Sequence, residues 1–216
     1  HRLDAKTKQQ TFDVIIADAP SQDGSTDHKI LESLGVRALI VLEEPGGLSS
    51  SLRAAIDFIV KEKYDGLVML DGNNKDDTSA LNEFADRLDD GWDYVQGSRF
   101  VAGGKEFNTP WQRKWLIKLV HAPLLSLLCG KWFTDTTNGF RAFSRLFLHD
   151  ARVGLESNTT KFYELPFYLA WAACRHKFRV CEIPVTRSYP PTKTFPTSIV
   201  GWRGHWRMLM PLFVIS

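Results

Sequence analysis

Short apolar runs alternate with amphipathic segments along most of the chain, and this alternation predicts the class of fold. Five runs, most of them rich in Val, Ile and Leu, are predicted strands: residues 12–17, 38–42, 66–70, 94–96 and 178–185. Five segments with apolar residues at helical spacing are predicted helices: residues 26–34, 48–60, 78–88, 111–128 and 161–175. Strands that are covered on both faces have continuous apolar runs of this kind. The pattern therefore predicts an α/β fold, with a mostly parallel central sheet flanked by helices.

Polar clusters follow three of the predicted strands, at the points where the strands end. Asp18 ends the first strand, Asp71 follows the third, and Gly97-Ser98-Arg99 follows the fourth. In open α/β sheets, ligands bind at the carboxyl ends of the strands. We therefore expect the clusters to share one rim, where Asp18 would hydrogen-bond a nucleotide base or ribose. An Asp that initiates a turn or caps a helix is the alternative at this position.

Asp71 and Asn73 offer two oxygen ligands, two residues apart on a turn, with Gly72 between them. Hard cations such as Mg²⁺ and Mn²⁺, which bind together with nucleotide phosphates, prefer oxygen donors of this kind. The pair is a candidate metal site, although Asp-Gly is also a routine turn dipeptide.

Two later segments also carry candidate chemistry. The run 135–141 is densely polar, and we expect a helix to begin behind it. Arg187 and Lys193 lie six residues apart on a loop that contains Pro190 and Pro191. Both side chains could reach phosphate oxygens, and two unrelated surface cations are the alternative.

Composition narrows the class of protein. The 216 residues are 44% hydrophobic and 24% charged, which is ordinary globular usage and excludes a collagenous or largely disordered chain. A chain of this length predicts a single domain over residues 1–216. The three cysteines lack CxxC spacing, so they predict neither a disulfide framework nor a cysteine zinc site.

The net charge of +2 hides a segregation of charge along the chain. Residues 65–93 contain nine acids and two bases, whereas residues 99–118 contain five bases and one acid. No acid follows Glu182. The basic segments bracket an acidic strand end that could hold a metal, so we expect phosphate-bearing ligands and no nucleic-acid partner.

Membrane contact is predicted by two segments. No apolar stretch approaches the roughly 20 residues that span a bilayer. The predicted helix 111–128 has an apolar face beside Lys114 and Lys118, which a core helix explains equally well. Residues 200–216 mix Trp and Arg with aliphatic residues, as interfacial segments do. We expect this second segment to be an interfacial anchor or the beginning of a transmembrane helix.

Taken in order, these motifs resemble the family 2 glycosyltransferases of GT-A (Rossmann-like) fold. Within that family they resemble the branch of dolichyl-phosphate mannose synthase and bacterial polyprenyl-phosphate glycosyltransferases. The most specific match is Asp135-x-Thr-Asn-Gly-Phe-Arg141, supported by the Gly-Ser-Arg that ends at Arg99 and by the Arg-x₅-Lys spacing of Arg187 and Lys193. The resemblance covers residues 12–193.

The chain departs from the family pattern at three places. Ala19 replaces the second Asp of the first nucleotide turn, and Asn73 replaces the second Asp of the Asp-x-Asp metal motif. Nothing before Phe12 matches the family's first strand, so that strand either lies upstream of His1 or is missing from this chain.

The resemblance implies a metal-dependent, inverting hexosyltransferase that moves a sugar from a UDP- or GDP-linked donor to a polyprenyl (dolichyl-like) phosphate. Asp71 and Asn73 would hold Mg²⁺ or Mn²⁺. The family's donor-binding positions fall on Asp18, Ser21, Asp23, Gly47 and Asp71. The implied catalytic residues are Asp71, Asp135, Arg187 and Lys193, of which the two cations would stabilise the departing diphosphate. The implied ligands of the acceptor phosphate are Arg99, Arg113 and Arg141.

A phosphate acceptor has a second pKa near 6 and is largely ionised at neutral pH, so it attacks without a strong general base. One alternative is the same fold acting on a glycan or other hydroxyl acceptor, with Asp135 as the general base. Another alternative is a non-catalytic homologue that binds a nucleotide sugar. For Arg141, the alternative to binding the acceptor phosphate is a structural pairing with Asp135. A lipid acceptor implies a cytoplasmic protein that is peripheral at, or anchored to, the cytoplasmic face of a membrane, with the membrane surface as a partner.

Overall fold

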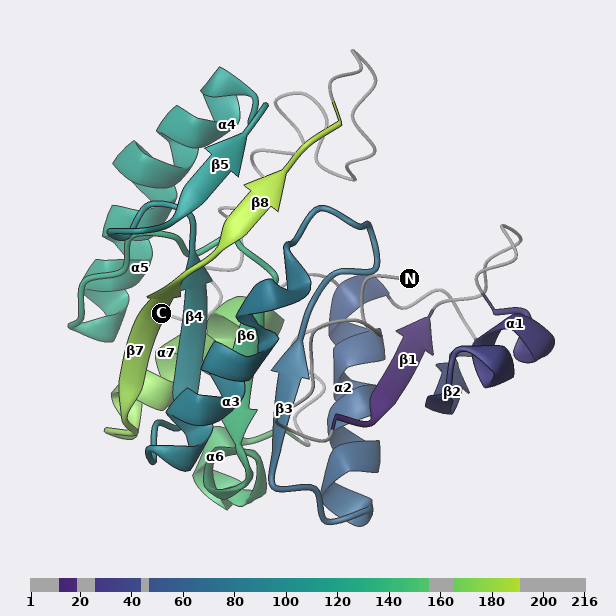
Figure 1. The fold of residues 1–216 in the computed structure, drawn as a ribbon. Helices are drawn as coiled ribbons and strands as arrows, with labels where there is room; N and C mark the ends of the chain where they lie inside the picture. Colours follow the sequence, from purple (N-terminus) through teal and green to yellow (C-terminus); the bar gives the residue numbers. More distant parts are fainter. Residues whose placement is uncertain (1–11, 19–25, 44–46, 156–164, 191–216) are drawn as a thin grey trace.

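The computed structural model describes residues 12–18, 26–43, 47–155 and 165–190. Its centre is a four-stranded sheet in the order β3 (Gly66–Met69), β6 (Arg141–Ser144), β4 (Tyr94–Ser98) and β7 (Val180–Pro184). β4 and β7 pair in parallel, whereas β6 runs antiparallel to both of its neighbours. β3, β4 and β7 therefore point the same way, which confirms the predicted mostly parallel sheet (Figure 1).

Two smaller parallel pairs accompany the central sheet. β1 (Val14–Asp18) pairs with β2 (Val36–Val41), and β5 (Lys105–Phe107) pairs with β8 (Thr186–Ser188). Only Val185 separates β7 from β8, and its N–H donates to the carbonyl of the last residue of β4. The β5–β8 pair thus continues the chain past the carboxyl ends of β4 and β7 (Figure 1).

Helices connect most of the strands. The α-helices are α1 (His28–Ser33), α2 (Gly47–Lys61), α3 (Leu81–Asp89), α4 (Trp111–Leu116), α5 (Ala122–Cys129), α6 (Arg145–His149) and α7 (Leu165–Arg175). A π-helical turn, η2 (Ile117–His121), joins α4 to α5, and 3₁₀ turns lie at η1 (Thr78–Ala80) and η3 (Ala151–Val153). Within the described residues, no helix is both long enough and apolar enough to cross a membrane.

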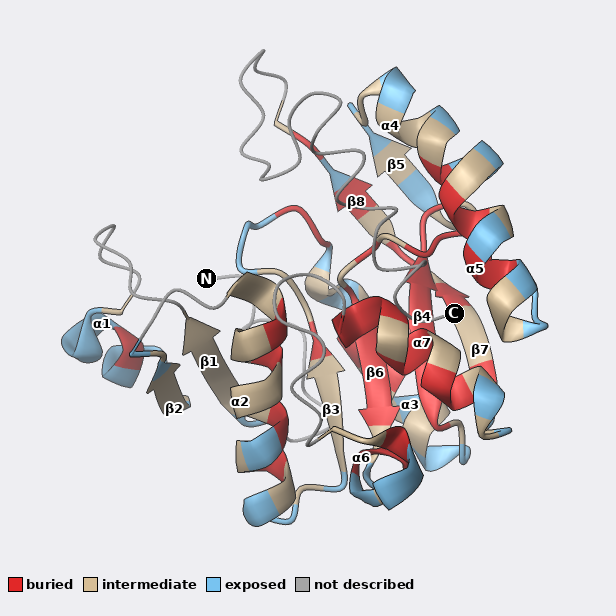
Figure 2. Ribbon diagram, turned by 180° about the vertical axis from the view of Figure 1, so that it is seen from behind, coloured by how far each residue is buried: buried red, intermediate tan, exposed pale blue. Residues whose placement is uncertain are grey.

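Neighbouring residues of the central strands enter two different cores, because side chains alternate between the two faces of a sheet. Tyr94 of β4 packs in the core that α2, α5, α6 and α7 cover. Val95, the next residue, packs on the opposite face against Phe84 of α3. In Figure 2 the ribbon of the central strands β4 and β6 is coloured mostly as buried. A sheet buried on both faces leaves its carboxyl ends as the place for polar chemistry.

The predicted strands and helical segments are confirmed, with shifts at their ends. The predicted helix 111–128 contains the π-helical turn, and the described part of the predicted helix 161–175 begins at Leu165. The expectation of a helix behind the run 135–141 is wrong, since that run leads into β6 and the next helix begins at Arg145. The segment before Phe12 and the predicted anchor 200–216 lie outside the described residues.

Candidate active site at the carboxyl ends of the strands

Charged side chains that are almost wholly buried gather where β3 and β4 end and β8 begins. This set comprises Lys75, Asp76, Arg99, Asp135, Arg141 and Arg187, each with 5% or less of its surface exposed. Lys75 and Asp76 lie on the loop after β3, Arg99 directly follows β4, and Arg187 lies in β8. Buried charges are costly unless they are paired, so their partners define the site.

Arg187 bridges two carboxylates. Its Nη2 lies 2.8 Å from Oδ2 of Asp71, and its Nη1 lies 2.6 Å from Oδ2 of Asp76. Burial alone would lower the pKa of Arg187, but the carboxylates of Asp76 and Asp71 outweigh burial and raise that pKa. For Asp76, burial dominates and raises the carboxyl pKa despite the guanidinium beside it. The predicted metal ligand Asp71 and the predicted diphosphate-binding Arg187 are therefore direct neighbours.

Backbone hydrogen bonds fix Arg187 opposite Asp76. The N–H of Ser188 donates to the carbonyl of Lys75 at 2.8 Å, and the N–H of Asp77 donates to the carbonyl of Thr186 at 3.0 Å. These bonds flank an isolated antiparallel bridge between Asp76 and Arg187. The loop after β3 is thus attached to β8 on both sides of the ion pair.

Asp71 lies against the backbone of Gly139, at the end of the loop before β6. A Cβ atom on Gly139 would lie 2.4 Å from Oδ1 of Asp71, so only glycine leaves room for this carboxylate. Asn73 Nδ2 donates to Asp71 Oδ2 at 3.3 Å, and Asn73 Oδ1 accepts the N–H of Lys75 at 3.2 Å. The structure therefore brings together the two predicted metal ligands, Asp71 and Asn73.

The chemistry of these donors fits a hard divalent cation. Asp71 and Asn73 offer carboxylate and amide oxygens, and Oδ1 of the buried Asp76 has no hydrogen-bond partner. Arg187, however, already neutralises both carboxylates. Within the described part of the chain, no group of three or more His, Cys, Asp or Glu side chains is arranged to hold a metal ion. A cation bound to Oδ2 of Asp71 would have to share that oxygen with Arg187.

Arg99 and Asp135 form a second buried ion pair. Arg99 Nε lies 2.6 Å from Asp135 Oδ2, Arg99 Nη2 lies 2.9 Å from Oδ1, and the Arg99 N–H donates to Oδ2 at 3.2 Å. Burial would raise the pKa of Asp135, but Arg99 outweighs burial and holds the pKa below its ordinary value. The suggested pairing of Arg141 with Asp135 is wrong, because Asp135 is ion-paired with Arg99 instead.

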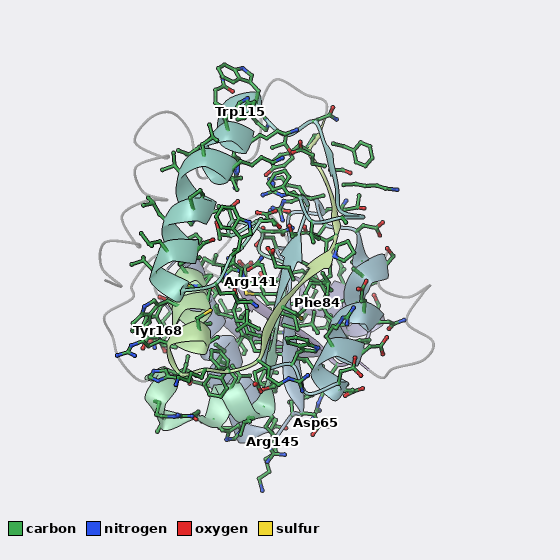
Figure 3. All side chains as sticks on the ribbon, turned by 90° about the vertical axis from the view of Figure 1, so that its left-hand side faces the viewer. Asp65, Phe84, Trp115, Arg141, Arg145 and Tyr168 are labelled. Atoms are coloured by element: carbon green, nitrogen blue, oxygen red, sulfur yellow. The ribbon has the colours of Figure 1, made fainter. Side chains whose placement is uncertain are left out.

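Arg141 holds backbone rather than a carboxylate. Its Nε donates to the carbonyl of Asn138 at 3.0 Å and its Nη2 to that of Thr136 at 2.9 Å. Its Nη1 donates to the carbonyl of Pro166 in α7. Figure 3 shows Arg141 in the interior between helix and sheet. These bonds attach the 136–138 loop to α7, so the structure gives Arg141 a role in building the site.

Tyr189 is a central residue that sequence reasoning missed. Its ring is buried, and three cations approach its centroid: Lys75 Nζ at 5.1 Å, Arg187 Cζ at 5.8 Å and Arg113 Cζ at 5.9 Å. Burial would raise the pKa of Tyr189, but Arg113, Arg99 and Arg187 outweigh burial and lower it. An aromatic residue two positions after Arg187 was the only signal in the sequence. The phenol ring is the centre around which the cations gather.

The remaining predicted site residues lie on other elements or outside the described residues. Asp18 ends β1, and Gly47 begins α2 with a φ of 67°, a left-handed conformation that favours glycine. Arg113 projects from α4 to Tyr189. The predicted residues Ser21, Asp23 and Lys193 lie outside the described residues.

No family model matches the chain, but individual relatives do. It is 33% identical over 140 residues to a polyprenol monophosphomannose synthase of Mycolicibacterium smegmatis, covering 65% of this chain and 52% of that protein. It is 27% identical to an undecaprenyl-phosphate mannosyltransferase of Micrococcus luteus, covering 81% of this chain and 71% of that protein. A dolichyl-phosphate hexose transferase of Haloferax volcanii is 31% identical, over 59% of this chain and 54% of that protein. The chain thus spans about half the length of the first of these relatives.

Solved structures show the same fold at low identity. Glucosyl-3-phosphoglycerate synthase from Mycobacterium tuberculosis with bound UDP superposes with a TM-score of 0.59 and 16% identity, over 92% of this chain and 68% of that one. The same enzyme with Mn²⁺, UDP and glucosyl-3-phosphoglycerate gives a TM-score of 0.59 and 14% identity, over 93% of this chain and 67% of that one. Both are glycosyltransferases of GT-A fold.

Proposed function

We propose that the chain is a family 2 glycosyltransferase of GT-A fold that transfers a hexose from a nucleoside-diphosphate sugar to the phosphate group of a polyprenyl lipid. The relatives named for polyprenol, undecaprenyl-phosphate and dolichyl-phosphate substrates support this choice of acceptor. Such a reaction brings two phosphate-bearing substrates together, so the site must bind two anions.

The cation cluster around Tyr189 carries the proposal. Its members are Lys75, Arg99, Arg113 and Arg187, and each acts electrostatically on the Tyr189 phenol or lies against its ring. Within the cluster, Arg99 is ion-paired with Asp135, and Arg187 is ion-paired with Asp71 and Asp76. Positive charge held away from water is stabilised by an anionic ligand. A phosphate is the ligand that this cluster suits best.

On the acceptor side, we assign the phosphate to Arg113 and Arg99. Nη1 of Arg99 is buried without a hydrogen-bond partner, so one donor of the guanidinium is not used by Asp135. The acceptor phosphate is largely ionised at neutral pH, and its oxygen can attack the sugar without a general base. A hydroxyl acceptor would need such a base, and Asp135, the candidate for it, is fully buried and ion-paired. The geometry therefore favours a phosphate over a hydroxyl acceptor.

On the donor side, negative charge builds on the departing diphosphate as the anomeric bond breaks. Arg187 and Lys193 are the cations that we assign to this charge, and Asp18, Ser21, Asp23 and Gly47 are the donor-binding positions. Mg²⁺ or Mn²⁺ held by Asp71 and Asn73 would supply further electrostatic stabilisation. The bound UDP and Mn²⁺ of the superposed enzyme support a divalent ion and leave UDP and GDP as the donor nucleotides to test.

An apolar stripe on the outside of the α4–α5 layer suits a membrane surface. It consists of Trp111, Trp115, Leu119 and Leu127, which are 67%, 53%, 65% and 80% exposed. Figure 3 shows Trp115 projecting from the end of this helical layer. Tryptophan and leucine beside lysines are typical of helices that lie in the lipid interface. We propose that the protein binds the cytoplasmic face of a membrane through this stripe, where a polyprenyl phosphate would be presented.

Replacing one acceptor cation tests the assignment of the acceptor. In a transfer assay with Mn²⁺ and the active UDP- or GDP-hexose, Arg113→Gln should raise the KM for polyprenyl phosphate about tenfold or more, because a charge-assisted hydrogen bond is lost. The KM for the donor should stay within about twofold of the wild-type value. Lys105→Gln, at an exposed position of β5, is the matched control and should change neither constant. An equal rise in both KM values, or no change, would refute the role of Arg113.

A further inference from the structure

Arg187 connects two aspartates that differ in how firmly they are held. The carboxylate of Asp76 is 0% exposed, and backbone hydrogen bonds on both sides of it keep it opposite Arg187. The carboxylate of Asp71 is 24% exposed, and the loop after β3 separates it from the Asp76–Arg187 bridge. The Arg187–Asp71 contact thus lies outside that backbone bridge, whereas Arg187 and Asp76 are the two bridged residues.

Asp71 cannot serve Arg187 and a divalent cation with the same oxygen. Oδ2 of Asp71 accepts Nη2 of Arg187 at 2.8 Å. A dication placed on that oxygen would meet the guanidinium as a like charge at close range. An anion between the two cations would accommodate both, and a diphosphate is such an anion.

The unpartnered oxygen of Asp76 offers a second place for the arginine. Oδ1 of Asp76 is buried and has no hydrogen-bond partner, while Oδ2 accepts Nη1 of Arg187. A buried acceptor without a partner is unfavourable, and a guanidinium pairs with a carboxylate best through two parallel bonds. An arginine released by Asp71 can therefore form a bidentate pair with Asp76.

We propose that Arg187 and a divalent cation exchange at Asp71, with Asp76 as the positioning residue that keeps Arg187 in the site after the exchange. This inference rests on the proposed use of a nucleoside-diphosphate donor. In the ligand-free protein, Arg187 neutralises Asp71. When metal and diphosphate bind together, the metal takes Asp71, and Arg187 stays on Asp76 beside the diphosphate. Metal binding and nucleotide binding are then strongly coupled, because metal alone must displace Arg187 without an anion to separate the two cations.

Titration of Mn²⁺ by calorimetry, with and without UDP or GDP, tests the exchange independently of catalysis. Wild-type protein should bind Mn²⁺ weakly alone and much more tightly with the nucleotide. Arg187→Gln should bind Mn²⁺ alone about tenfold more tightly than wild type, and the gain from the nucleotide should shrink, within the usual range of coupling between sites. Arg152→Gln, which removes an exposed arginine paired with Asp150, is the matched control and should behave as wild type.

The variant Asp76→Asn distinguishes the proposed exchange from a purely structural role of Asp76 and Arg187. Without the Asp76 carboxylate, Arg187 depends on Asp71 alone, so Mn²⁺ should bind more weakly than to wild type. The two variants should thus shift Mn²⁺ affinity in opposite directions, whereas general damage to the site would weaken both. If Arg187→Gln does not fold, Arg187→Lys replaces it. The compact ammonium lacks the planar fork with which the guanidinium contacts both carboxylates, so the contact with Asp71 should weaken and Mn²⁺ affinity should again rise.

Unchanged or weaker Mn²⁺ binding in the folded Arg187 variant would overturn the exchange. The proposed function is judged by a different measurement, the transfer of hexose to polyprenyl phosphate. If hexose is transferred but Mn²⁺ binding is unchanged in the variants, the proposed function is supported and the exchange is refuted. If Mn²⁺ binding follows the predicted pattern but no hexose is transferred, the exchange is supported and the proposed polyprenyl phosphate acceptor is refuted.

Discussion

At the scale of single residues, the site depends on carboxylates that arginines neutralise inside the fold. The side chains of Asp135 and Arg99 are 0% and 1% exposed, and two side-chain bonds of 2.6 and 2.9 Å join them. Removing one partner of a buried ion pair leaves an uncompensated charge, which costs much more than the pair itself contributes. The pair therefore contributes to the stability of the site, and Arg99 is also one of the two residues that we assign to the acceptor phosphate.

Asp135→Asn should lower the free energy of unfolding by about 3–5 kcal/mol, because Arg99 would remain buried and unpaired. Urea denaturation measures this loss. Asp150→Asn, which breaks an exposed pair with Arg152, is the matched control and should leave the unfolding midpoint unchanged. A variant of wild-type stability that has lost all turnover would instead identify Asp135 as a general base.

The contribution of Asp135 should also depend on pH in one direction. Arg99 lowers the pKa of Asp135 in the folded protein, so the stabilisation is complete above the ordinary aspartate pKa of about 4. It is lost as the pH falls below that value and through the folded pKa. The difference in unfolding free energy between wild type and Asp135→Asn should therefore shrink below pH 4. A constant difference from pH 7 to pH 3 would contradict the ion pair.

Gly139→Ala should displace Asp71, because the added Cβ would lie 2.4 Å from its Oδ1. We expect binding of the metal–nucleotide complex to weaken about tenfold or more, the usual effect of losing a charged hydrogen-bonding group. Gly72→Ala is the matched control, since nothing lies within 4 Å of its Cβ position. Calorimetry measures the affinity of both variants for the metal–nucleotide complex. Equal affinities of the two variants would show that Asp71 does not need this close contact.

The sequence was enough to predict which polar residues follow the strands, but not how they pair. Asp71, Asn73 and Arg187 were singled out, and the structure brings them together. Arg99 meets Asp135 across 36 positions and Arg187 meets Asp71 across 116, so neither pair has a local signature. Tyr189 was missed because burial makes it important, and burial depends on the whole fold.

At the scale of elements, the helical layer from α4 to α5 has an inward face and an exposed face, and we propose a different role for each. Arg113 points inward to Tyr189, while Trp111 and Trp115, two positions to either side, are exposed. The π-helical turn η2 widens the spiral after α4, which changes the rotation between successive residues. This turn keeps Leu119 and Leu127, at spacings of four and eight, on the outer surface.

Replacing Trp111 and Trp115 together by Ser should weaken binding to anionic vesicles about tenfold or more, since each inserted aromatic side chain contributes more than about 1 kcal/mol. Vesicle flotation measures the bound fraction. Leu146→Ser is the matched control, because Leu146 is an equally exposed apolar residue on α6, away from the stripe. Undiminished binding by the double variant would contradict the proposed membrane-facing stripe.

The longer elements were predictable because their apolar periodicity extends over several turns or a whole strand. The strands β5, β6 and β8, of three or four residues each, were not predicted. β6 reads Arg-Ala-Phe-Ser and has no β-branched residue, so local preference gave no indication of a central strand. Pairing with β3 and β4 determines its conformation.

At the scale of the whole molecule, charges that are segregated along the sequence meet in space. The acidic segment 65–93 supplies Asp71 and Asp76, and the basic segment 99–118 supplies Arg99 and Arg113. β8 adds Arg187 from the part of the chain that has no acid after Glu182. The near-neutral net charge of the chain thus conceals a site in which buried opposite charges from these segments are paired.

The most direct test of this account compares two acceptors that differ only in the phosphate. Purified protein with Mn²⁺ and UDP- or GDP-hexose is given polyprenyl phosphate or the polyprenol of the same chain length, and glycolipid formation is followed. We predict a glycosyl-phosphate lipid from polyprenyl phosphate and no product above background from polyprenol. Transfer to polyprenol at a comparable rate, or binding of the donor with no transfer to polyprenyl phosphate, would contradict the proposed function.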